Sequence, residues 1–219
     1  MDKDKKLVII GDSAFAEVAF EYFTYDSPYE VAAFAVEREY LKRTSLFERP
    51  VVAFEELETQ YPPGQYEAFA ALVYTQHNRL RTRLYREAKN KGYRMASFIS
   101  PHAFVWPNVE IGEHCFIFEN NVIQPFVKIG SNVVLWSGNH VGHHSRIKDN
   151  CFIASHAVIS GFTNIGENCF MGVNVTVHNN INIGDDCIIG AGAMVSKDIP
   201  DGTVLKGPRT VIAQGEDRK

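Results

Sequence analysis

The C-terminal half of the chain carries an apolar residue at every sixth position. From Val105 to Val195, each of these positions is aliphatic or Met, without an insertion. The residue two places earlier is always uncharged and no larger than Ile. A strict period of six fits neither the 3.6-residue period of an amphipathic helix nor simple strand alternation. It predicts a solenoid of short strands and tight corners, in which three hexapeptides make one triangular coil and both positions point inward.

All four cysteines fall on the smaller inward position. Cys151 follows Cys115 by two whole coils, and Cys169 and Cys187 each follow the preceding cysteine by one. We therefore expect them to stack in one column inside the solenoid and to behave as small hydrophobic residues. The chain has no Cys-x-x-Cys pair, so the cysteines do not indicate a metal site.

Residues 1–100 show a different pattern, in which short apolar runs alternate with amphipathic segments. Strands are predicted at Leu7–Ile10, Tyr29–Val36, Ala68–Tyr74 and Met95–Ile99, and helices at Ala14–Phe23, Ala53–Gln60 and His77–Lys91. This alternation predicts a small parallel α/β sheet, giving domains at 1–100 and 101–219. A solvated face of the last helix is expected to hold the basic residues Arg79, Arg81, Arg83, Arg86 and Lys89.

Composition and charge are those of an ordinary soluble globular protein. Of 219 residues, 45% are hydrophobic and 22% charged, and the formal net charge is −4. This charge gives no electrostatic basis for binding nucleic acid. No apolar run approaches the roughly 18 residues of a membrane span, and Leu7–Ile10 is too short for the core of a signal peptide. We therefore expect a cytoplasmic protein without membrane insertion.

The first predicted strand, the turn at Gly11 and the helix after it resemble the start of a nucleotide-binding unit. A helix N-terminus favours a phosphate group, and Glu37 follows the second strand, where an acidic side chain can hold a ribose or a base. The segment Gly11-Asp-Ser-Ala-Phe15 has one glycine and is therefore not a dinucleotide fingerprint. A purely structural α/β domain is the alternative.

Five of the eight histidines lie between residues 140 and 178, most densely in Trp136-Ser-Gly-Asn-His-Val-Gly-His-His144. With Val141 pointing inward, His140 points outward, and the last two histidines lie near a corner that faces solvent or a neighbouring subunit. A histidine placed there is a natural general base near neutral pH. A metal site is one alternative, but no two histidines are separated by one or two whole coils, so none is expected. The other alternative is that these histidines only line an interface between subunits.

These features together resemble a known family. Residues 103–195 are similar to the hexapeptide-repeat transferases, and nearly the whole chain resembles the sugar acyltransferases of the NeuD and PglD type. The resemblance implies a small Rossmann-like half domain followed by a left-handed parallel β-helix. It implies acetyl-CoA-dependent N-acetylation of a nucleotide-linked amino-deoxy sugar for surface glycans such as lipopolysaccharide. It further implies a homotrimer with active sites between subunits, the N-terminal domain holding the nucleotide sugar and a β-helix groove holding coenzyme A.

The segment Gly138-Asn-His-Val-Gly-His143 resembles the family's catalytic segment, which implies that His143 takes a proton from the sugar amine. His144 stands where the family often has an acidic residue, and we count it as catalytic too. The resemblance also implies a set of residues along the coenzyme groove, with the lysine near its phosphates: Gly161, Val173, Ala191 and Lys197.

The expected acceptor site departs from the family at three positions. Phe15 stands where the family carries His, Trp136 where it commonly has Asn, and Phe152 where it commonly has a second His. The residues expected to bind the nucleotide sugar are Gly11, Ser13, Phe15, Glu37, Trp136, Asn139, His140 and His156. Sugar O-acylation by the same histidine is an alternative reaction, and a non-catalytic solenoid interaction protein is an alternative of another class.

Overall fold

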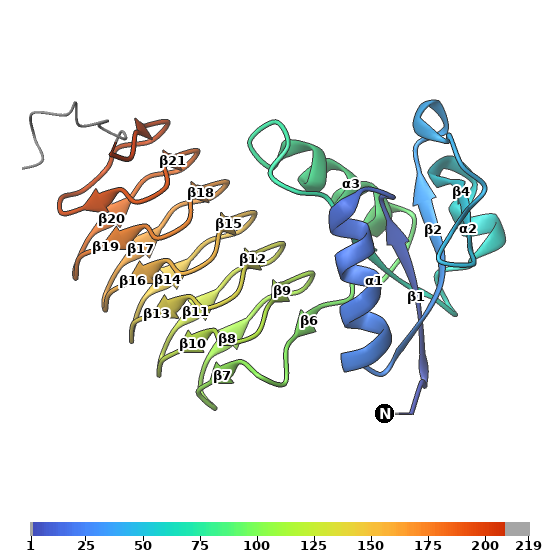
Figure 1. Ribbon diagram of the computed structural model, residues 1–219, viewed down its shortest axis with the longest axis horizontal. Helices are drawn as coiled ribbons and strands as arrows, with labels where there is room; N and C mark the ends of the chain where they lie inside the picture. The colour runs from blue at the N-terminus through green and yellow to red at the C-terminus, as the bar shows by residue number, and fades with distance from the viewer. Residues whose placement is uncertain (1, 209–219) are drawn as a thin grey trace, which may run out of the picture.

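The computed structural model describes residues 2–208 and consists of a small α/β unit followed by a solenoid of stacked triangular coils (Figure 1). Met1 and residues 209–219, the last part of the expected second domain, lie outside the described residues. The predicted architecture, an α/β unit before a left-handed parallel β-helix, is confirmed.

The N-terminal unit, which we call the cap, is a sheet of order β3-β4-β2-β1-β5. Strands β1 (Lys5–Ile10), β2 (Tyr29–Val36), β4 (Arg49–Ala53) and β5 (Glu67–Ala70) are parallel, and β3 (Ser45–Leu46) is antiparallel to β4. Three predicted strands are present, with shifted ends for the first and third. The hairpin of β3 and β4 was not predicted. Its turn, Phe47 and Glu48, has a positive φ at both residues, and neither residue is of a type that announces such a turn.

Helices cover both faces of this sheet. Helix α1 (Ala14–Asp26) packs on the face that carries Leu7 and Ile9, and α2 (Leu57–Gln60) and α3 (Arg79–Asn90) pack on the face that carries Val8 and Ile10. This follows from strand alternation, because successive side chains of β1 point to opposite faces and all four are apolar. Two short 3₁₀ helices, η1 (Arg38–Tyr40) and η2 (Phe54–Glu56), follow β2 and β4.

The solenoid has three faces, each a parallel sheet in which every short strand pairs with the strand one coil later. The cap face contains β6 (Phe98–Ile99), β9 (Phe116–Ile117), β12 (Val134–Leu135), β15 (Phe152–Ile153), β18 (Phe170–Met171), β21 (Ile188–Ile189) and β23 (Val204–Leu205). The apolar face contains β7 (Phe104–Val105), β10 (Val122–Ile123), β13 (His140–Val141), β16 (Val158–Ile159), β19 (Thr176–Val177) and β22 (Met194–Val195). The charged face contains β8 (Glu110–Ile111), β11 (Lys128–Ile129), β14 (Arg146–Ile147), β17 (Asn164–Ile165) and β20 (Asn182–Ile183).

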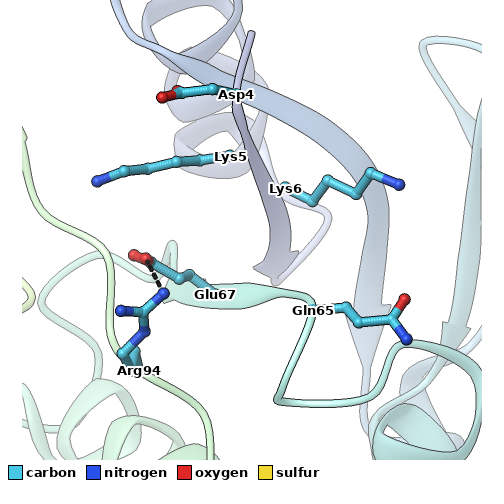
Figure 2. A pocket seen from close by; sticks show the side chains of 6 residues that line it. All are labelled: Asp4, Lys5, Lys6, Gln65, Glu67 and Arg94. Carbon is cyan, nitrogen blue, oxygen red and sulfur yellow. Dashed lines mark ion pairs between the residues drawn. The ribbon is translucent and has the colours of Figure 1, made fainter.

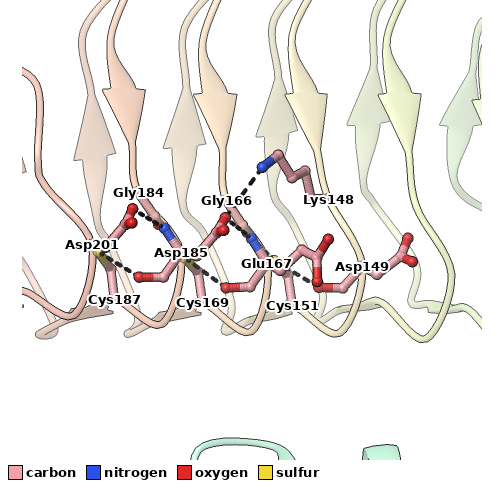
Figure 3. A network of polar contacts seen from close by, with 10 residues as sticks. All are labelled: Lys148, Asp149, Cys151, Gly166, Glu167, Cys169, Gly184, Asp185, Cys187 and Asp201. Carbon is pink, nitrogen blue, oxygen red and sulfur yellow. Dashed lines mark hydrogen bonds and ion pairs between the residues drawn. The ribbon is translucent and has the colours of Figure 1, made fainter.

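The predicted inward positions form the solenoid core. From Cys115 to Val195 the apolar side chains at these positions are buried, whereas Val105 and Ile111 in the first coil are only partly buried. The four cysteines are free and fully buried in one column, as predicted. Each thiol donates to a carbonyl at the neighbouring corner, for example Cys151 Sγ to Gly166 O at 3.0 Å (Figure 3). Beside this column, Asp185 accepts the Glu167 N–H at 2.7 Å and so links consecutive coils.

Aromatic side chains attach the cap to the solenoid. The outward residues of the cap face begin with Phe98, Phe116, Val134 and Phe152, and these pack against α1 in one buried cluster. Phe23 of α1 meets Phe98 and Phe116 edge to face, with ring centroids 5.7 Å apart in both pairs. An unbroken outward apolar row of this kind would be exposed on a free solenoid, so it fixes the face on which the cap docks.

Arg81 corrects one expectation, because it is fully buried and not part of a solvated face. Its guanidinium donates to the carbonyls of Ala70 at 3.2 Å, His114 at 3.2 Å and Asn132 at 3.5 Å. Burial lowers the pKa of Arg81 to about 9, which still leaves it charged at neutral pH. A cation buried without a carboxylate is tolerated here because backbone carbonyls take its N–H groups. The helix periodicity could not reveal this, since α3 turns this side toward the solenoid.

Candidate active site

The carboxyl ends of β1 and β5 form the part of the cap best suited to bind a ligand. The chain leaves β1 toward β2 on one side, and β5 joins on the other, so the order of the sheet reverses here. Ligands of open parallel sheets bind at this reversal. Gly11 has φ +118°, and a Cβ there would lie 2.9 Å from the Ala71 carbonyl oxygen. Glycine is therefore required, because it lets the two strand ends approach closely.

The N-terminus of α1 lies at the same place. Ser13 is its N-cap, is exposed, and makes no side-chain capping bond. The free N–H groups of the first turn suit a phosphate. Glu37, after β2, is held by Arg83 through two hydrogen bonds of 2.9 Å. This pairing raises the pKa of Arg83 and fixes the orientation of the Glu37 carboxylate.

Phe15 and Trp136 lie together where α1 meets the cap face, with ring centroids 5.8 Å apart. Phe15 is 2% exposed, whereas Trp136 is half-buried and stacked on Phe118 at 4.4 Å. Of the two, Trp136 therefore has surface left for a ligand.

A hollow of about 300 Å³ lies on another part of the cap (Figure 2). It is lined at the amino ends of β1 and β5 by Asp4, Lys5, Lys6, Gln65, Glu67 and Arg94. Glu67 accepts a hydrogen bond from the Tyr29 hydroxyl and forms an ion pair with Arg94 at 3.1 Å. This hollow is at the strand ends opposite Gly11, so it is not part of the predicted site.

His143 and His144 occupy the corner between the apolar and charged faces, which we call the His143 corner (residues 124–126, 142–144, 160–162 and 178–180). Both histidines are exposed, and their Nδ1 atoms are 3.1 Å apart. Gln124 accepts the His143 backbone N–H at 2.9 Å. A Cβ on Gly161 would lie 2.9 Å from His143 Cε1, so the imidazole rests against this glycine of the next coil. The predicted base is thus open to solvent but held on one side.

The other predicted site residues near the histidines lie in three different places. His140 points outward from β13 and is half-buried. His156 is exposed at the corner between the cap and apolar faces, where a Cβ on Gly138 would touch its ring at 2.6 Å. Asn139 is 1% exposed, donating to the Trp136 carbonyl and accepting the Ala157 N–H at 2.8 Å. Its amide closes a corner and presents no surface to a substrate.

The expected coenzyme residues lie on two edges of the apolar face. Gly161 and Lys197 follow His143 by one and three whole coils and share its column. Val173 and Ala191 are exposed at the corner shared with the cap face and lie one coil apart in the column of Ser137. Because the width of the apolar face separates these edges, one chain does not line a single groove with all four residues.

The described residues contain no group of three or more His, Cys, Asp or Glu side chains arranged to hold a metal ion. Among residues 2–208, no helix is both long and apolar enough to cross a bilayer.

Comparisons with known proteins agree with the fold. Residues 126–161 match the family described as bacterial transferase hexapeptide (six repeats), and residues 162–197 match the hexapeptide repeat of succinyl-transferase. A search of the curated proteins finds no match.

Solved structures match along almost the whole chain. A histidine-to-asparagine variant of perosamine N-acetyltransferase from Caulobacter crescentus, in complex with CoA and GDP-perosamine, is 28% identical with a TM-score of 0.82, covering 92% of this chain and 93% of that one. The acetyltransferase domain of PglB from Neisseria gonorrhoeae is 27% identical with a TM-score of 0.84, covering 93% and 97%. The chain is an acyltransferase that contains hexapeptide repeats. WeeI from Acinetobacter baumannii, 18% identical with a TM-score of 0.63 over 93% of this chain and 97% of that one, shares the fold.

Sequence reasoning missed the aromatic neighbours of the histidines in this acyltransferase. Phe126 lies one coil before His144 and Phe162 one coil after it, and all three have a positive φ. The coil spacing predicted that these side chains share a column, but the predictions concerned only the polar members of the segment.

Proposed function

We propose that this acyltransferase moves the acetyl group of acetyl-CoA to the amine of a nucleotide-linked amino sugar, with His143 as the general base. The observation that carries the proposal is the match, over 92% of the chain, to an N-acetyltransferase in complex with CoA and GDP-perosamine. The exposed histidine resting on Gly161 supplies the base that such a reaction needs. A cytoplasmic location and a role in surface glycan synthesis, including lipopolysaccharide, belong to the same proposal.

In this reaction the amine nitrogen attacks the thioester carbonyl and its proton passes to His143 Nε2. The C–S bond then breaks, and the coenzyme leaves as a thiol by taking that proton. Nδ1 of His143 contacts His144, so Nε2 is the nitrogen available to the acceptor. A backbone N–H near the corner stabilises the oxyanion formed during attack.

The active site is proposed to lie between chains of a homotrimer. The cap covers one face, whereas His143 stands at the corner opposite that face, so a nucleotide sugar held by a cap reaches a histidine of another chain. The outward residues of the apolar face support this, since Phe104, Val122, Val158 and Met194 are between 37% and 65% exposed. Val173 and Ala191 then line the coenzyme groove opposite Gly161 and Lys197 of a neighbouring chain.

The cap, residues 1–100, is proposed as the nucleotide-sugar domain, and residues 101–219 as the acyltransferase domain. Gly11, Ser13 and Glu37 lie nearest the strand ends that would take the nucleotide. Trp136, His140 and His156 are proposed to contact the sugar. Phe15 and Asn139, which are buried, support these surfaces from behind.

The test is thiol release from acetyl-CoA with a panel of UDP-, dTDP- and GDP-linked amino sugars, each paired with its hydroxyl analogue. Release with one amino sugar and none with its analogue is the expected result. Release with the hydroxyl analogue alone would instead identify sugar O-acylation.

His143→Ala is expected to lower kcat at least about 100-fold, the usual scale for losing a general base. His102→Ala removes an exposed histidine of the first coil and should leave kcat unchanged. Near-normal turnover by the His143→Ala enzyme would remove His143 from the mechanism.

A further inference from the structure

His143 and His144 form a hydrogen-bonded pair whose tautomers are mutually determined. The two Nδ1 atoms are 3.1 Å apart, so one nitrogen carries the proton and the other accepts it. If His143 Nδ1 donates, His143 Nε2 has a free lone pair. If His144 Nδ1 donates, His143 is protonated at Nε2 and has no basic nitrogen facing the acceptor.

Two phenylalanines clamp the His144 ring. Phe126 stacks on one side, with ring centroids 4.6 Å apart and planes 28° apart, and Phe162 stacks on the other at 4.8 Å and 16°. Phe162 also meets the His143 ring edge to face at 5.1 Å. Because His144 is held between two parallel rings, its Nδ1 stays directed at His143 even though the corner is exposed.

The backbone at this clamp is unusual for its residue types. In the described solenoid, the other corner residues with positive φ are Gly, Asn, Asp or His, which tolerate this conformation. Phe126 has φ 65° and Phe162 has φ 58°, and they are 55% and 49% exposed. A phenylalanine in this conformation costs free energy, and an exposed side chain does not offset that cost by burial. Residues with strained backbones are concentrated at functional sites. Both strained phenylalanines contact the same histidine ring.

We propose that His144, clamped by Phe126 and Phe162, is a positioning residue that accepts a hydrogen bond from His143 Nδ1–H and so fixes the tautomer with a free Nε2. This rests on the proposed role of His143 as the base. A third group that orients the base is the general design of such sites, and here it is a neutral imidazole in place of a carboxylate.

An imidazole partner can either accept or donate the hydrogen bond at His143 Nδ1, whereas a carboxylate can only accept it. The groups packed on the two rings are Phe126, Phe162 and Gly161, and the Gln124 amide oxygen accepts the backbone N–H of His143. In the described residues, no carboxylate, lysine or arginine hydrogen-bonds to either ring. A proton taken up by His144 makes its Nδ1 a donor, which reverses the hydrogen bond and leaves the proton of His143 on Nε2.

Three substitutions of His144 distinguish the contribution of its Nδ1 acceptor from the contribution of its ring. His144→Phe keeps a ring in the stack and removes the acceptor, and a phenylalanine fits this backbone, as Phe126 and Phe162 show. His144→Asn removes the ring but puts an amide oxygen at the place of Nδ1. His144→Asp puts a charged oxygen there. Asn and Asp both tolerate the positive φ of 60°.

We expect His144→Phe to lower kcat at least about 10-fold with both KM values within about twofold, and His144→Asn to stay within about threefold of the wild type in kcat. His144→Asp should move the acid limb of the kcat/KM profile to higher pH, because a carboxylate stabilises the imidazolium form of His143. Unchanged kcat and pH profile in His144→Phe would overturn the proposal. Equal losses in the Phe and Asn variants would also overturn it, since an acceptor oxygen at the place of Nδ1 would then restore nothing.

A second readout does not depend on catalysis. The ¹⁵N spectrum of histidine-labelled wild-type protein, assigned with the His143→Ala and His144→Phe variants, should show His143 protonated at Nδ1 and bare at Nε2. An Nε2-protonated His143 at the pH of activity overturns the positioning role. If His143→Ala retained turnover while the spectrum showed the expected tautomer, the proposed function would fail and the hydrogen-bonded pair would stand.

Discussion

Histidines of the solenoid differ in what surrounds them, and His114 is the most enclosed. Its Nε2 accepts the Ala70 N–H at 2.9 Å, its Nδ1 bonds Asn132 Oδ1 at 2.9 Å, and its ring stacks on Tyr85 at 4.8 Å. Burial, together with the nearby Arg81 cation, lowers the pKa of His114 well below its usual value. The neutral ring satisfies both contacts, so protonation would break the Ala70 bond that joins cap and solenoid.

This predicts acid sensitivity. The unfolded chain takes up a proton at His114 near pH 6.5 while the native protein does not, so stability is retained above that pH and lost below it, by up to about 1.4 kcal/mol per pH unit. Urea unfolding between pH 8 and 5, followed by the fluorescence of Trp136 in a Trp106→Phe background, measures the slope. His114→Gln should reduce the slope, whereas His102→Gln, at an exposed histidine, should not. Equal slopes in both variants would contradict the assignment.

For single residues, the sequence predicted which side chains point inward or outward better than it predicted which residues they contact. Cys151 and Ile153 followed from spacing alone, and both are fully buried. Arg81 and His114 could not be predicted, because their burial depends on where α3 meets a solenoid corner. The roles of His143 and His144 stay predictions.

At the level of secondary-structure elements, the backbones of consecutive coils approach each other closely at the corners. Gly142 and Gly161 lie at the same corner of consecutive coils in neighbouring columns, and a Cβ on Gly142 would lie 2.5 Å from the Gly161 nitrogen. A Cβ on Gly161 would instead meet the His143 ring, so the next coil provides the support of the proposed base. Neither glycine has a positive φ; backbone of the next coil leaves no room for a Cβ at Gly142, whereas only the His143 side chain fills that space at Gly161.

Gly161→Ala should therefore displace His143 without unfolding the solenoid. We expect kcat to fall about 10-fold or more, because a small misplacement of a catalytic group is costly, while the thermal unfolding midpoint changes little. Gly64→Ala is the matched control, since nothing lies within 4 Å of its Cβ position. Unchanged kcat in Gly161→Ala would show that His143 can act from another ring position.

The repeat made the solenoid strands from β7 to β22 predictable, since their positions depend only on counting by six, whereas β23 lies beyond the predicted repeat. The cap was predicted less well. The strand expected at Met95–Ile99 is reduced to β6 and a bridge between Met95 and Ala68, and β6 already pairs with the solenoid strand β9. Tertiary pairing, not local propensity, decides where such short strands begin and end.

Across the whole molecule, the three solenoid faces have different outward residues. The cap face is apolar and covered by the cap, the charged face carries residues such as Lys128 and Arg146, and the apolar face is uncovered in the single chain. The repeat predicted three faces, but which of them would meet the cap or another chain depends on outward residues that the counting did not use.

Val158→Arg should dissociate the proposed trimer, because it places a charge at a 42% exposed position on the apolar face. Light scattering should show a fall from three chain masses to one, with loss of turnover. Asn164→Arg, on the exposed side of the charged face, should change neither property. A trimeric and active Val158→Arg protein would move the interface elsewhere.

Each solenoid residue pairs with the residue one full coil later. The position of a residue in the sequence, counted in hexapeptides, therefore determines which face or corner of the solenoid it occupies. Removing one hexapeptide before His143 would keep every later aliphatic residue inward, because the inward pattern repeats with each hexapeptide. It would nevertheless turn each later face by one third of a revolution, so the histidine pair would arrive at the corner beside the cap and Phe152 would leave the cap face. Removing a whole coil would restore the faces and only shorten the stack. Insertions and deletions upstream of the corner are therefore tolerated in whole coils, and the site itself changes by substitution.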